Sequence, residues 1–360
     1  MENTQKPYFP ALTGLRAVAA FMVFFYHVPI PDKLIGRTLF SCCNQLYIGV
    51  SVFFVLSGFL IYTRYNESIE KRKGWLMAYF KNRFARIYPM YFLVTVITFL
   101  LHNQSGNVKV IYEGHFWLTL IMNLTLLRGF FTNFLLTGVV QGWTLTVEET
   151  FYLLAPAIML FTRKIKLGFQ VLFFYFLGYS LFLTFKNTGS YGFFAAFPFV
   201  VYATFFGRCL DFYVGIQIAI WYRNRKAFAI TSKKYTYMGI ASIFITIVLL
   251  AMLKGNDDSD FLGTNRLLAN NLLLPFAIGA MLWGILTEQT FFRIMLETPF
   301  FQLAGKSSYC FYLIHTGIFS ELLFRYCTHN YFYNFPVLVL LSVLLFMYIE
   351  EPLHKAIRKL

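Results

Sequence analysis

Apolar stretches recur along the whole 360-residue chain, and they limit its possible folds more than any other feature. Hydrophobic residues make up 58% of the sequence and charged residues only 13%, a balance that soluble domains do not show. Ten stretches are long enough to span, or nearly span, a bilayer as helices: 11–28, 46–63, 88–101, 146–162, 168–185, 208–222, 236–253, 268–287, 307–324 and 333–349. The sequence therefore predicts an all-α polytopic membrane protein, a helical bundle of about ten transmembrane helices.

Two further apolar stretches, 115–127 and 191–206, are expected to be interfacial or re-entrant pieces, and either would change the helix count if it spanned. Residues 1–360 are expected to form one membrane domain without an appended soluble domain, because only about ten residues follow the last predicted helix. The first apolar stretch is interpreted as a helix rather than a cleaved signal peptide, because it contains Arg16 and another span follows it directly.

Basic residues gather in three of the loops between the predicted helices. Residues 64–86 hold seven basic and two acidic residues, 163–166 hold three basic residues, and 223–234 hold five. Loops rich in Lys and Arg stay on the cytoplasmic side, whereas the intervening loops are nearly neutral or acidic, notably at 257–260. This predicts that both termini are cytoplasmic. It also explains the net charge of +15 without a nucleic-acid partner, because the basic residues do not follow one stripe.

The five cysteines do not have the spacing of a metal site or of a disulfide framework, and no metal is expected. Because Cys42 and Cys43 precede the second predicted span and Cys327 follows the ninth, a bridge between either of the first two and Cys327 stays open.

Arg16 and His27 lie on the first predicted helix, where charged and titratable side chains are costly and therefore suggest a function. They are eleven residues apart, which puts them on nearly the same helix face and about 16 Å apart along the axis. One face of this helix can thus present the Arg16 cation toward the cytoplasm and the His27 imidazole toward the non-cytoplasmic side. The alternative is that Arg16 reaches the cytoplasmic headgroups while His27 lies at the opposite interface.

Glu148 lies near the start of a predicted helix on the non-cytoplasmic side, at the expected level of His27. Such a carboxylate can orient an imidazole or hold sugar hydroxyls, or it can simply be placed favourably at a helix N-terminus. Arg83 and Arg86 would share a face if their segment is helical, and two guanidinium groups suit the phosphates of a nucleotide-bearing donor. Ordinary positive-inside anchoring is the alternative for these arginines. His315, in the ninth predicted span, fits either a bonded core histidine or a ligand contact.

Five motifs, in order, resemble those of the membrane acyltransferase-3 family. They are LTGLRAVAA at 12–20 followed by His27, GVSVFFVLSGFLI at 49–61, RFARIYP at 83–89, WTLTVE at 143–148 and GKSSYCFYLIH at 305–315. The closing IEEP at 349–352 is also similar, so the resemblance covers essentially the whole chain. Thr144 replaces a commoner serine and Thr150 a commoner glutamine, departures that bear on acceptor choice rather than on the reaction class.

The resemblance implies a ten-helix enzyme that moves an acyl group, usually acetyl from acetyl-CoA, onto a carbohydrate or another hydroxylated acceptor, commonly in the bacterial envelope. It implies that His27 is the catalytic histidine, with Arg16 as its partner in the motif and Glu148 as the acidic motif residue. We expect His27 and Glu148 to be catalytic, Arg16, Arg83 and Arg86 to bind the donor, and Trp143 and His315 to contact the substrate. We therefore expect a multi-pass O-acetyltransferase of the bacterial inner membrane. Its partners would be acyl-CoA, the lipid bilayer and a carbohydrate or lipid-linked glycan such as O-antigen, lipopolysaccharide or exopolysaccharide.

The residues leave two questions open. His27 could act as a general base on an acceptor hydroxyl or as a nucleophile toward the thioester. A secondary transporter or flippase of an acylated or glycan substrate would also place Arg, Glu and His within the membrane, and an inactive scaffold is a third alternative.

Overall fold

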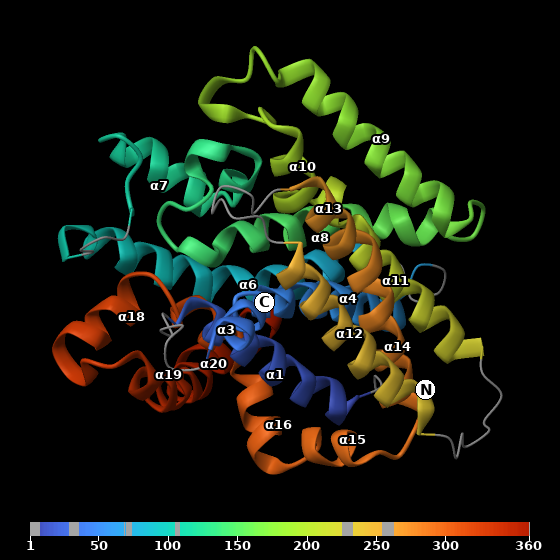
Figure 1. Cartoon of the computed structure of the whole chain (residues 1–360). Helices are drawn as coiled ribbons and strands as arrows, with labels where there is room; N and C mark the ends of the chain where they lie inside the picture. Colours follow the sequence, from blue (N-terminus) through green and yellow to red (C-terminus); the bar gives the residue numbers. More distant parts are fainter. Residues whose placement is uncertain are drawn as a thin grey trace.

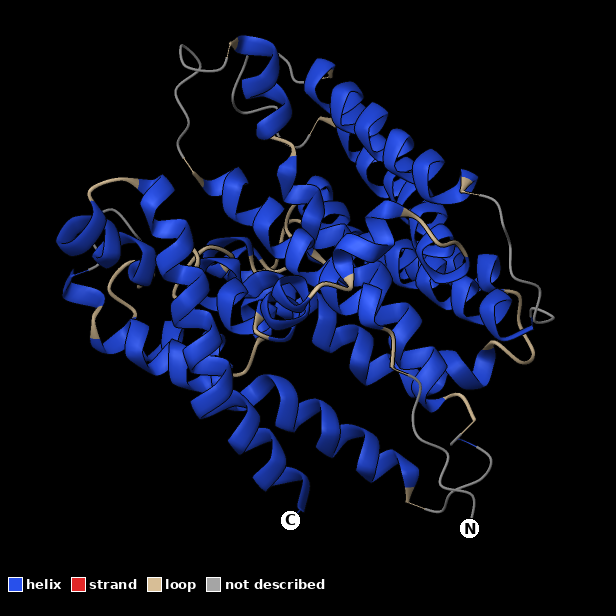
Figure 2. Ribbon diagram, turned by 90° about the horizontal axis from the view of Figure 1, so that it is seen from below, coloured by secondary structure: helices blue, strands red, loops and turns tan. Residues whose placement is uncertain are grey.

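The structure of the chain is a computed structural model that describes residues 8–28, 36–67, 69, 74–104, 109–224, 233–253 and 263–359. Figure 2 shows that the described part is built of helices. Its β-structure is limited to one isolated antiparallel bridge between Phe131 and Phe193. The predicted all-α fold is therefore confirmed.

Nine helices in the described part are long and apolar enough to cross a membrane. Their main segments are α1 (Pro10–His27), α4 (Gly49–Tyr65), α6 (Trp75–Leu100), α8 (Trp143–Phe161), α9 (Leu167–Phe185), α11 (Phe205–Asn224), α12 (Lys234–Met252), α14 (Leu274–Thr287) and α19 (Tyr331–Leu345). Short helices extend four of them: α3 (Arg37–Cys43), α10 (Phe197–Ala203), α13 (Thr264–Leu268) and α20 (Glu351–Lys359). Figure 1 shows how these helices gather around α4, α6 and α11. Nine of the ten predicted spans thus correspond to such a helix.

The predicted span 307–324 is not one continuous helix, and this part of the prediction is wrong. It consists of α17 (Ser308–Ile314) and α18 (Ile318–Leu323), and α17 directly follows α16 (Pro299–Lys306). Gly317 separates α17 from α18 with φ 76° and ψ −150°, a conformation that glycine adopts readily. The Gln141 side chain donates hydrogen bonds to the carbonyls of Tyr312 at 2.7 Å and Leu313 at 2.6 Å. These carbonyls would otherwise accept from the next helical turn, so Gln141 caps the end of α17.

Other boundaries also differ from the prediction. Helix α6 begins at Trp75, well before the predicted start at 88, because the polar residues between Lys81 and Arg86 lower the local hydropathy without preventing helix formation. Stretch 115–127 contains α7 (Phe116–Leu124), which is too short to span, and stretch 191–206 contains α10, which leads into α11. Neither stretch forms an additional span.

The three basic loops meet at one end of the bundle, called here the basic end. Arg163 donates a hydrogen bond to the carbonyl of Asn66 at 3.2 Å, and Arg223 forms an ion pair with Glu67 at 3.0 Å. Phe9, just before α1, packs its ring 5.7 Å from that of Tyr222. The described segments of these loops and the start of α1 therefore share a side, as predicted. The acidic stretch 257–260 lies outside the described residues.

We expect the basic end to face the cytoplasm, because its positive charge resists translocation. Exposed Lys164 lies at this end and exposed Asn187 lies beyond the opposite end of α9. In a background without Cys42, Cys43 and Cys327, an impermeant thiol reagent should label Asn187→Cys in intact cells. It should label Lys164→Cys only after permeabilisation. The reverse pattern would show the opposite orientation.

Glycines allow α4 and α11 to pack with their backbones in contact. A Cβ atom added at Gly58 of α4 would lie 2.1 Å from the carbonyl oxygen of Phe212 in α11. A Cβ at Gly215 of α11 would lie 2.1 Å from the carbonyl oxygen of Val55 in α4. Close helix crossings through small residues are typical of membrane bundles, where van der Waals packing rather than water exclusion joins the helices. This crossing holds the centre of the bundle together.

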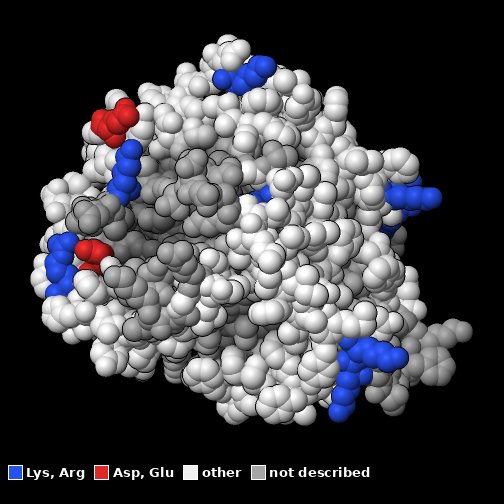
Figure 3. Space-filling view, viewed as in Figure 1, with Lys and Arg blue, Asp and Glu red and all other residues white. Residues whose placement is uncertain are grey.

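Few charged side chains appear on the face shown in Figure 3, and most of them lie near its periphery. Large apolar side chains are exposed instead, especially on α9 and α12. Only 22% of the apolar stretch of α9 and 28% of that of α12 are buried. A surface of this kind suits contact with lipid. It is consistent with the predicted membrane location.

Candidate functional site

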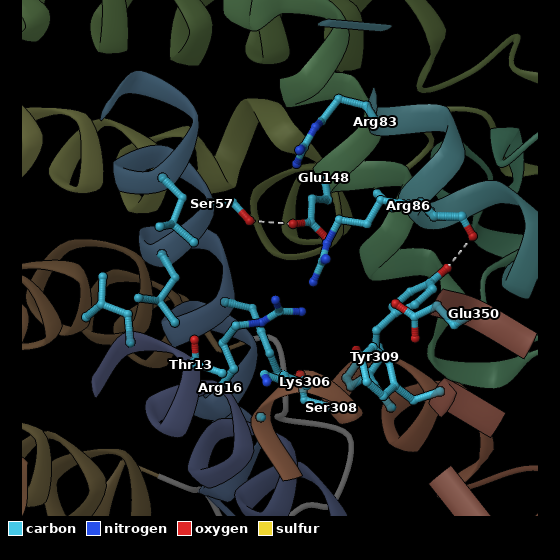
Figure 4. A pocket seen from close by; sticks show the side chains of 18 of the residues that line it. Thr13, Arg16, Ser57, Arg83, Arg86, Glu148, Lys306, Ser308, Tyr309 and Glu350 are labelled. Atoms are coloured by element: carbon cyan, nitrogen blue, oxygen red, sulfur yellow. Dashed lines mark hydrogen bonds between the residues drawn. The ribbon is translucent and has the colours of Figure 1, made fainter. Parts of the chain in front are cut away.

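A cavity of about 590 Å³ opens among α1, α4, α6, α8, α16, α17 and α20. It lies toward the basic end, because its lining includes Phe9 before α1 and Arg64 at the end of α4. Figure 4 shows that the residues motivating the sequence hypothesis converge here, with Arg16, Arg83, Arg86 and Glu148 around one space. The structure thus brings four of the seven predicted site residues together.

Positive charge exceeds negative charge around this cavity. Five Lys or Arg side chains line it, namely Arg16, Arg64, Arg83, Arg86 and Lys306, against three carboxylates, Glu148, Glu350 and Glu351. Glu351 already forms an ion pair with Lys355, and Glu350 accepts a hydrogen bond from the Cys310 thiol at 3.1 Å. The guanidinium groups of Arg16 and Arg86 make no hydrogen bond or ion pair with another described residue. The cavity can therefore accept an anionic ligand.

Arg83 and Arg86 share one face of α6, as predicted for a helical segment. Arg83 is buried, and its guanidinium lies over the rings of Tyr65, at 5.9 Å, and Tyr152, at 5.5 Å. Arg86 is half-buried and, in Figure 4, points into the cavity. Arg83 is thus held by aromatic neighbours, whereas Arg86 has its donors available.

Glu148 is bound within the cavity rather than next to His27. One of its carboxylate oxygens accepts hydrogen bonds from the hydroxyls of Ser57 in α4 and Tyr152, one turn further along α8. A carboxylate in apolar surroundings needs such donors, and these two are within reach. Of the roles left open for Glu148, a direct contact that orients His27 is not present in this structure, and His27 instead lies next to the imidazole of His315.

His27 and His315 form a pair at the end of α1 away from the basic end. Their rings are 5.2 Å apart, and His27 Nδ1 lies 3.3 Å from His315 Nε2. His27 is exposed, whereas His315 is only 2% exposed. The break after α17 positions His315 here, since the chain turns away directly after it.

The backbone around the two histidines determines which ring nitrogens carry protons. His27 Nδ1 lies 2.8 Å from the carbonyl of Val23, and His315 Nδ1 lies 2.7 Å from the carbonyl of Tyr312. A carbonyl can only accept, so both Nδ1 atoms donate. In neutral His315 the Nε2 atom is then an acceptor, and it faces the Nδ1–H of His27. The lone pair of neutral His27 is therefore on Nε2.

Tyr312 separates the cavity from the two histidines. Its hydroxyl is 2.8 Å from that of Thr144, one turn before Glu148, and its ring packs 5.8 Å from that of Phe53. These three residues all line the cavity, whereas His27 and His315 do not. On the other side the Tyr312 ring is 5.4 Å from that of His315. The side chain of Tyr312 thus lies between the cationic cavity and the His27–His315 pair.

Trp143 lies outside the cavity. Its half-buried ring is 5.4 Å from that of Tyr202, which in turn is 6.3 Å from Tyr47. Its predicted contact with substrate stays a prediction. All five cysteines are free, so the bridge left open by the sequence is not formed in this structure. Within the described residues no three His, Cys, Asp or Glu side chains are grouped to hold a metal ion.

Comparison with known proteins decides the family. A family model described as an acyltransferase domain, that of acyltransferase family 3, matches residues 9–351. The chain belongs to the membrane acyltransferase-3 family. It therefore carries an acyltransferase domain over nearly its whole length. No solved structure matches the chain.

The relatives of this acyltransferase domain carry related names. A protein of Staphylococcus aureus strain COL, provisionally named an O-acetyltransferase, is 23% identical over 97% of this chain and 58% of its own length. The peptidoglycan O-acetyltransferase OatA of Listeria monocytogenes is 29% identical over 44% of this chain and 25% of its own. The acyltransferase MdmB of Streptomyces mycarofaciens is 32% identical over 43% of this chain and 40% of its own length. The chain thus spans little more than half the length of the Staphylococcus relative.

Several residues of the candidate site were not singled out from the sequence. Ser57 and Tyr312 lie inside family motifs, but hydroxyl groups are common in membrane helices and give no signal of their own. Lys306 was placed in a motif without a role, although it lines the cavity. The capping role of Gln141 depends on a contact across 171 residues of sequence, which only the fold reveals.

Proposed function

We propose that the protein transfers an acetyl group from acetyl-CoA, bound from the basic end, to a hydroxyl group of an envelope glycan at the opposite end. The observation that carries this proposal is the arrangement of the two sites. A cavity with an excess of cations ends at Tyr312, and an exposed imidazole lies just beyond it. Such an arrangement suits a phosphate-bearing donor on one side and an acceptor on the other.

The donor would place its phosphates near Arg64, Arg86 and Lys306, whose side chains form no ion pair with a described carboxylate. Arginine and lysine are the usual ligands of phosphate groups. The narrow acyl-bearing arm would extend past Arg16 and Glu148 toward Tyr312. Because His27 lies outside the cavity, the Tyr312–Thr144 contact must open for the thioester to reach it.

Nε2 of His27 is the reactive nitrogen in this proposal. As a general base it takes the proton of the acceptor hydroxyl while that oxygen attacks the thioester carbonyl. The carbon–sulfur bond then breaks, and the leaving thiolate receives the proton. His315 and the Val23 carbonyl share the Nδ1–H of His27, which keeps the lone pair on Nε2 and stabilises the protonated ring. A nucleophilic role for the same nitrogen would use the same tautomer.

The names of the relatives guide the choice of acceptor. One is named a peptidoglycan O-acetyltransferase, so peptidoglycan fragments are the first acceptors to test, beside O-antigen, lipopolysaccharide and exopolysaccharide. The purified protein is incubated with acetyl-labelled acetyl-CoA and each glycan. Transfer predicts labelled glycan and an equal amount of free CoA. A transporter or flippase would move its substrate across proteoliposomes without releasing CoA, and that result would overturn the proposal.

We predict that Arg86→Ala raises the KM for acetyl-CoA by about 10–100-fold, because a charge-assisted contact with a phosphate contributes about 1.5–3 kcal/mol. The matched control is Arg223→Ala, which removes the same charge at the basic end but outside the cavity. KM and kcat are measured for both variants, with acceptor in excess. An equal rise in the control would assign the effect to the overall charge of this end and contradict a direct contact.

A further inference from the structure

A second hollow lies on the outer side of the bundle and shares no lining residue with the candidate site. It has a volume of about 990 Å³, and α11 forms its floor with Leu210, Tyr213, Val214, Gln217, Ile218 and Trp221. The first two turns of α9 form one wall, and α14 forms the other. Tyr235, at the start of α12, closes the end near the basic loops.

This groove exists because α9 and α14 both pack on α11 but do not pack closely on each other. Figure 1 shows α9 running along the outer edge of the molecule. Small residues keep the space between the helices open, since Gly279 and Ala280 of α14 and Gly168 of α9 all line it. Nothing lies within 4 Å of a Cβ built at Gly168.

The groove opens to the part of the surface that contacts lipid. Phe169 of α9 is 65% exposed and Phe276 of α14 is 60% exposed, and both line the groove. Trp221 and Trp283 pack edge to face, 6.3 Å apart, within its lining. Apolar hollows of this kind do not hold water, so in a bilayer the groove must be filled by hydrocarbon. Its lining follows α11 from Leu210 to Trp221, about three helical turns, a length that an acyl chain can fill.

The end of the groove carries positive charge. Lys166 lines the groove and is exposed. Lys164, two residues before Lys166, and Lys233, directly before α12, are also exposed. The nearby carboxylate of Glu288 is buried and already accepts hydrogen bonds from the backbone amides of Tyr235 and Thr236. Glu288 forms no ion pair with Lys166. Basic residues at the membrane surface attract anionic headgroups.

We propose that this groove binds one phospholipid with an anionic headgroup, whose acyl chain lies along α11 between α9 and α14 and whose phosphate contacts Lys166. The charge at the groove end selects the headgroup, and the apolar walls hold the chain. The site is independent of acyl transfer, because none of its lining residues lines the donor cavity.

Native mass spectrometry of the delipidated full-length protein, titrated with phosphatidylglycerol or phosphatidylethanolamine, tests this site. Ala280→Trp fills the groove from the α14 wall, and Leu210→Trp fills it from the floor. Ala241→Trp is the matched control, because Ala241 is exposed on α12 but does not line the groove. Lys166→Ala tests the headgroup contact. Each variant is used only if it elutes as a monodisperse species, and two filling variants guard against one misfolding.

The wild type and Ala241→Trp should retain one tightly bound phosphatidylglycerol, and at least one filling variant should lose it by about tenfold in affinity. Lys166→Ala should lower the preference for phosphatidylglycerol by about fivefold, the contribution of one surface lysine. Equal lipid binding by the folded filling variants and by Ala241→Trp would overturn the site. Equal affinity of the wild type for the two lipids would overturn the anionic headgroup.

Discussion

His27→Ala is expected to lower acyl transfer by about 10²–10⁴-fold while leaving CoA binding intact. The side chain that is lost carries the only ring nitrogen of the pair with a free lone pair, since Nδ1 of His27 is committed to the Val23 carbonyl and to His315. His315 cannot replace it, because its own Nδ1 donates to Tyr312 and it is buried. CoA binding should persist, because His27 does not line the cationic cavity.

The measurement compares product formation by purified wild type and His27→Ala at equal amounts, with CoA affinity determined on the same samples. His115→Ala is the matched control, because it removes an exposed imidazole that does not contact the His27–His315 pair. His315→Ala should leave a larger residual activity than His27→Ala, since it removes only a positioning group. Near-normal transfer by His27→Ala would exclude this histidine from the mechanism and require another group to act as the base or nucleophile.

Gly58→Leu is expected to prevent accumulation of folded protein. The first added atom would lie 2.1 Å from the backbone carbonyl of Phe212, and a backbone atom inside a helix cannot rotate away as a side chain can. Helices α4 and α11 would have to separate, and overpacking of a close-packed interior typically costs about 1–3 kcal/mol even when side chains can adjust. The cost here should exceed that range, because both helices approach at this crossing through glycine.

Thermal unfolding in detergent, followed by the fraction that elutes as a monodisperse peak, measures this effect. Gly58→Ala should already lower the midpoint. Gly168→Ala is the control, because a Cβ at Gly168 has no neighbour within 4 Å and should leave the midpoint unchanged. A wild-type midpoint for Gly58→Ala would show that α4 and α11 can separate without loss of stability.

Sequence patterns predicted the parts of the fold that depend on local hydropathy and charge. The apolar runs gave nine spans, and the three basic loops were correctly assigned to one side, as the Arg223–Glu67 and Arg163–Asn66 contacts confirm. The spacing of Arg83 and Arg86 correctly predicted a shared face once the segment proved helical. These features follow from neighbouring residues, so periodicity could reveal them.

The remaining features depend on contacts between distant segments. Gln141 ends α17, and Ser57 and Tyr152 rather than His27 hold Glu148. Helix periodicity gives the direction of a side chain around its own axis but not the rotation of the neighbouring helix. The helix that carries Glu148 was therefore predicted without the partners that its carboxylate contacts. The groove on α11 could not be predicted either, since it depends on the gap between α9 and α14.

The position of Gln141 has a mechanical consequence. This residue caps α17 through the carbonyls of Tyr312 and Leu313, and two residues later α8 begins with Trp143 and continues to Glu148. A helix is stiff along its axis, so the cap and the carboxylate move as one body. A displacement of this part of α8 would therefore also shift the end of α17, and with it His315, which directly follows α17.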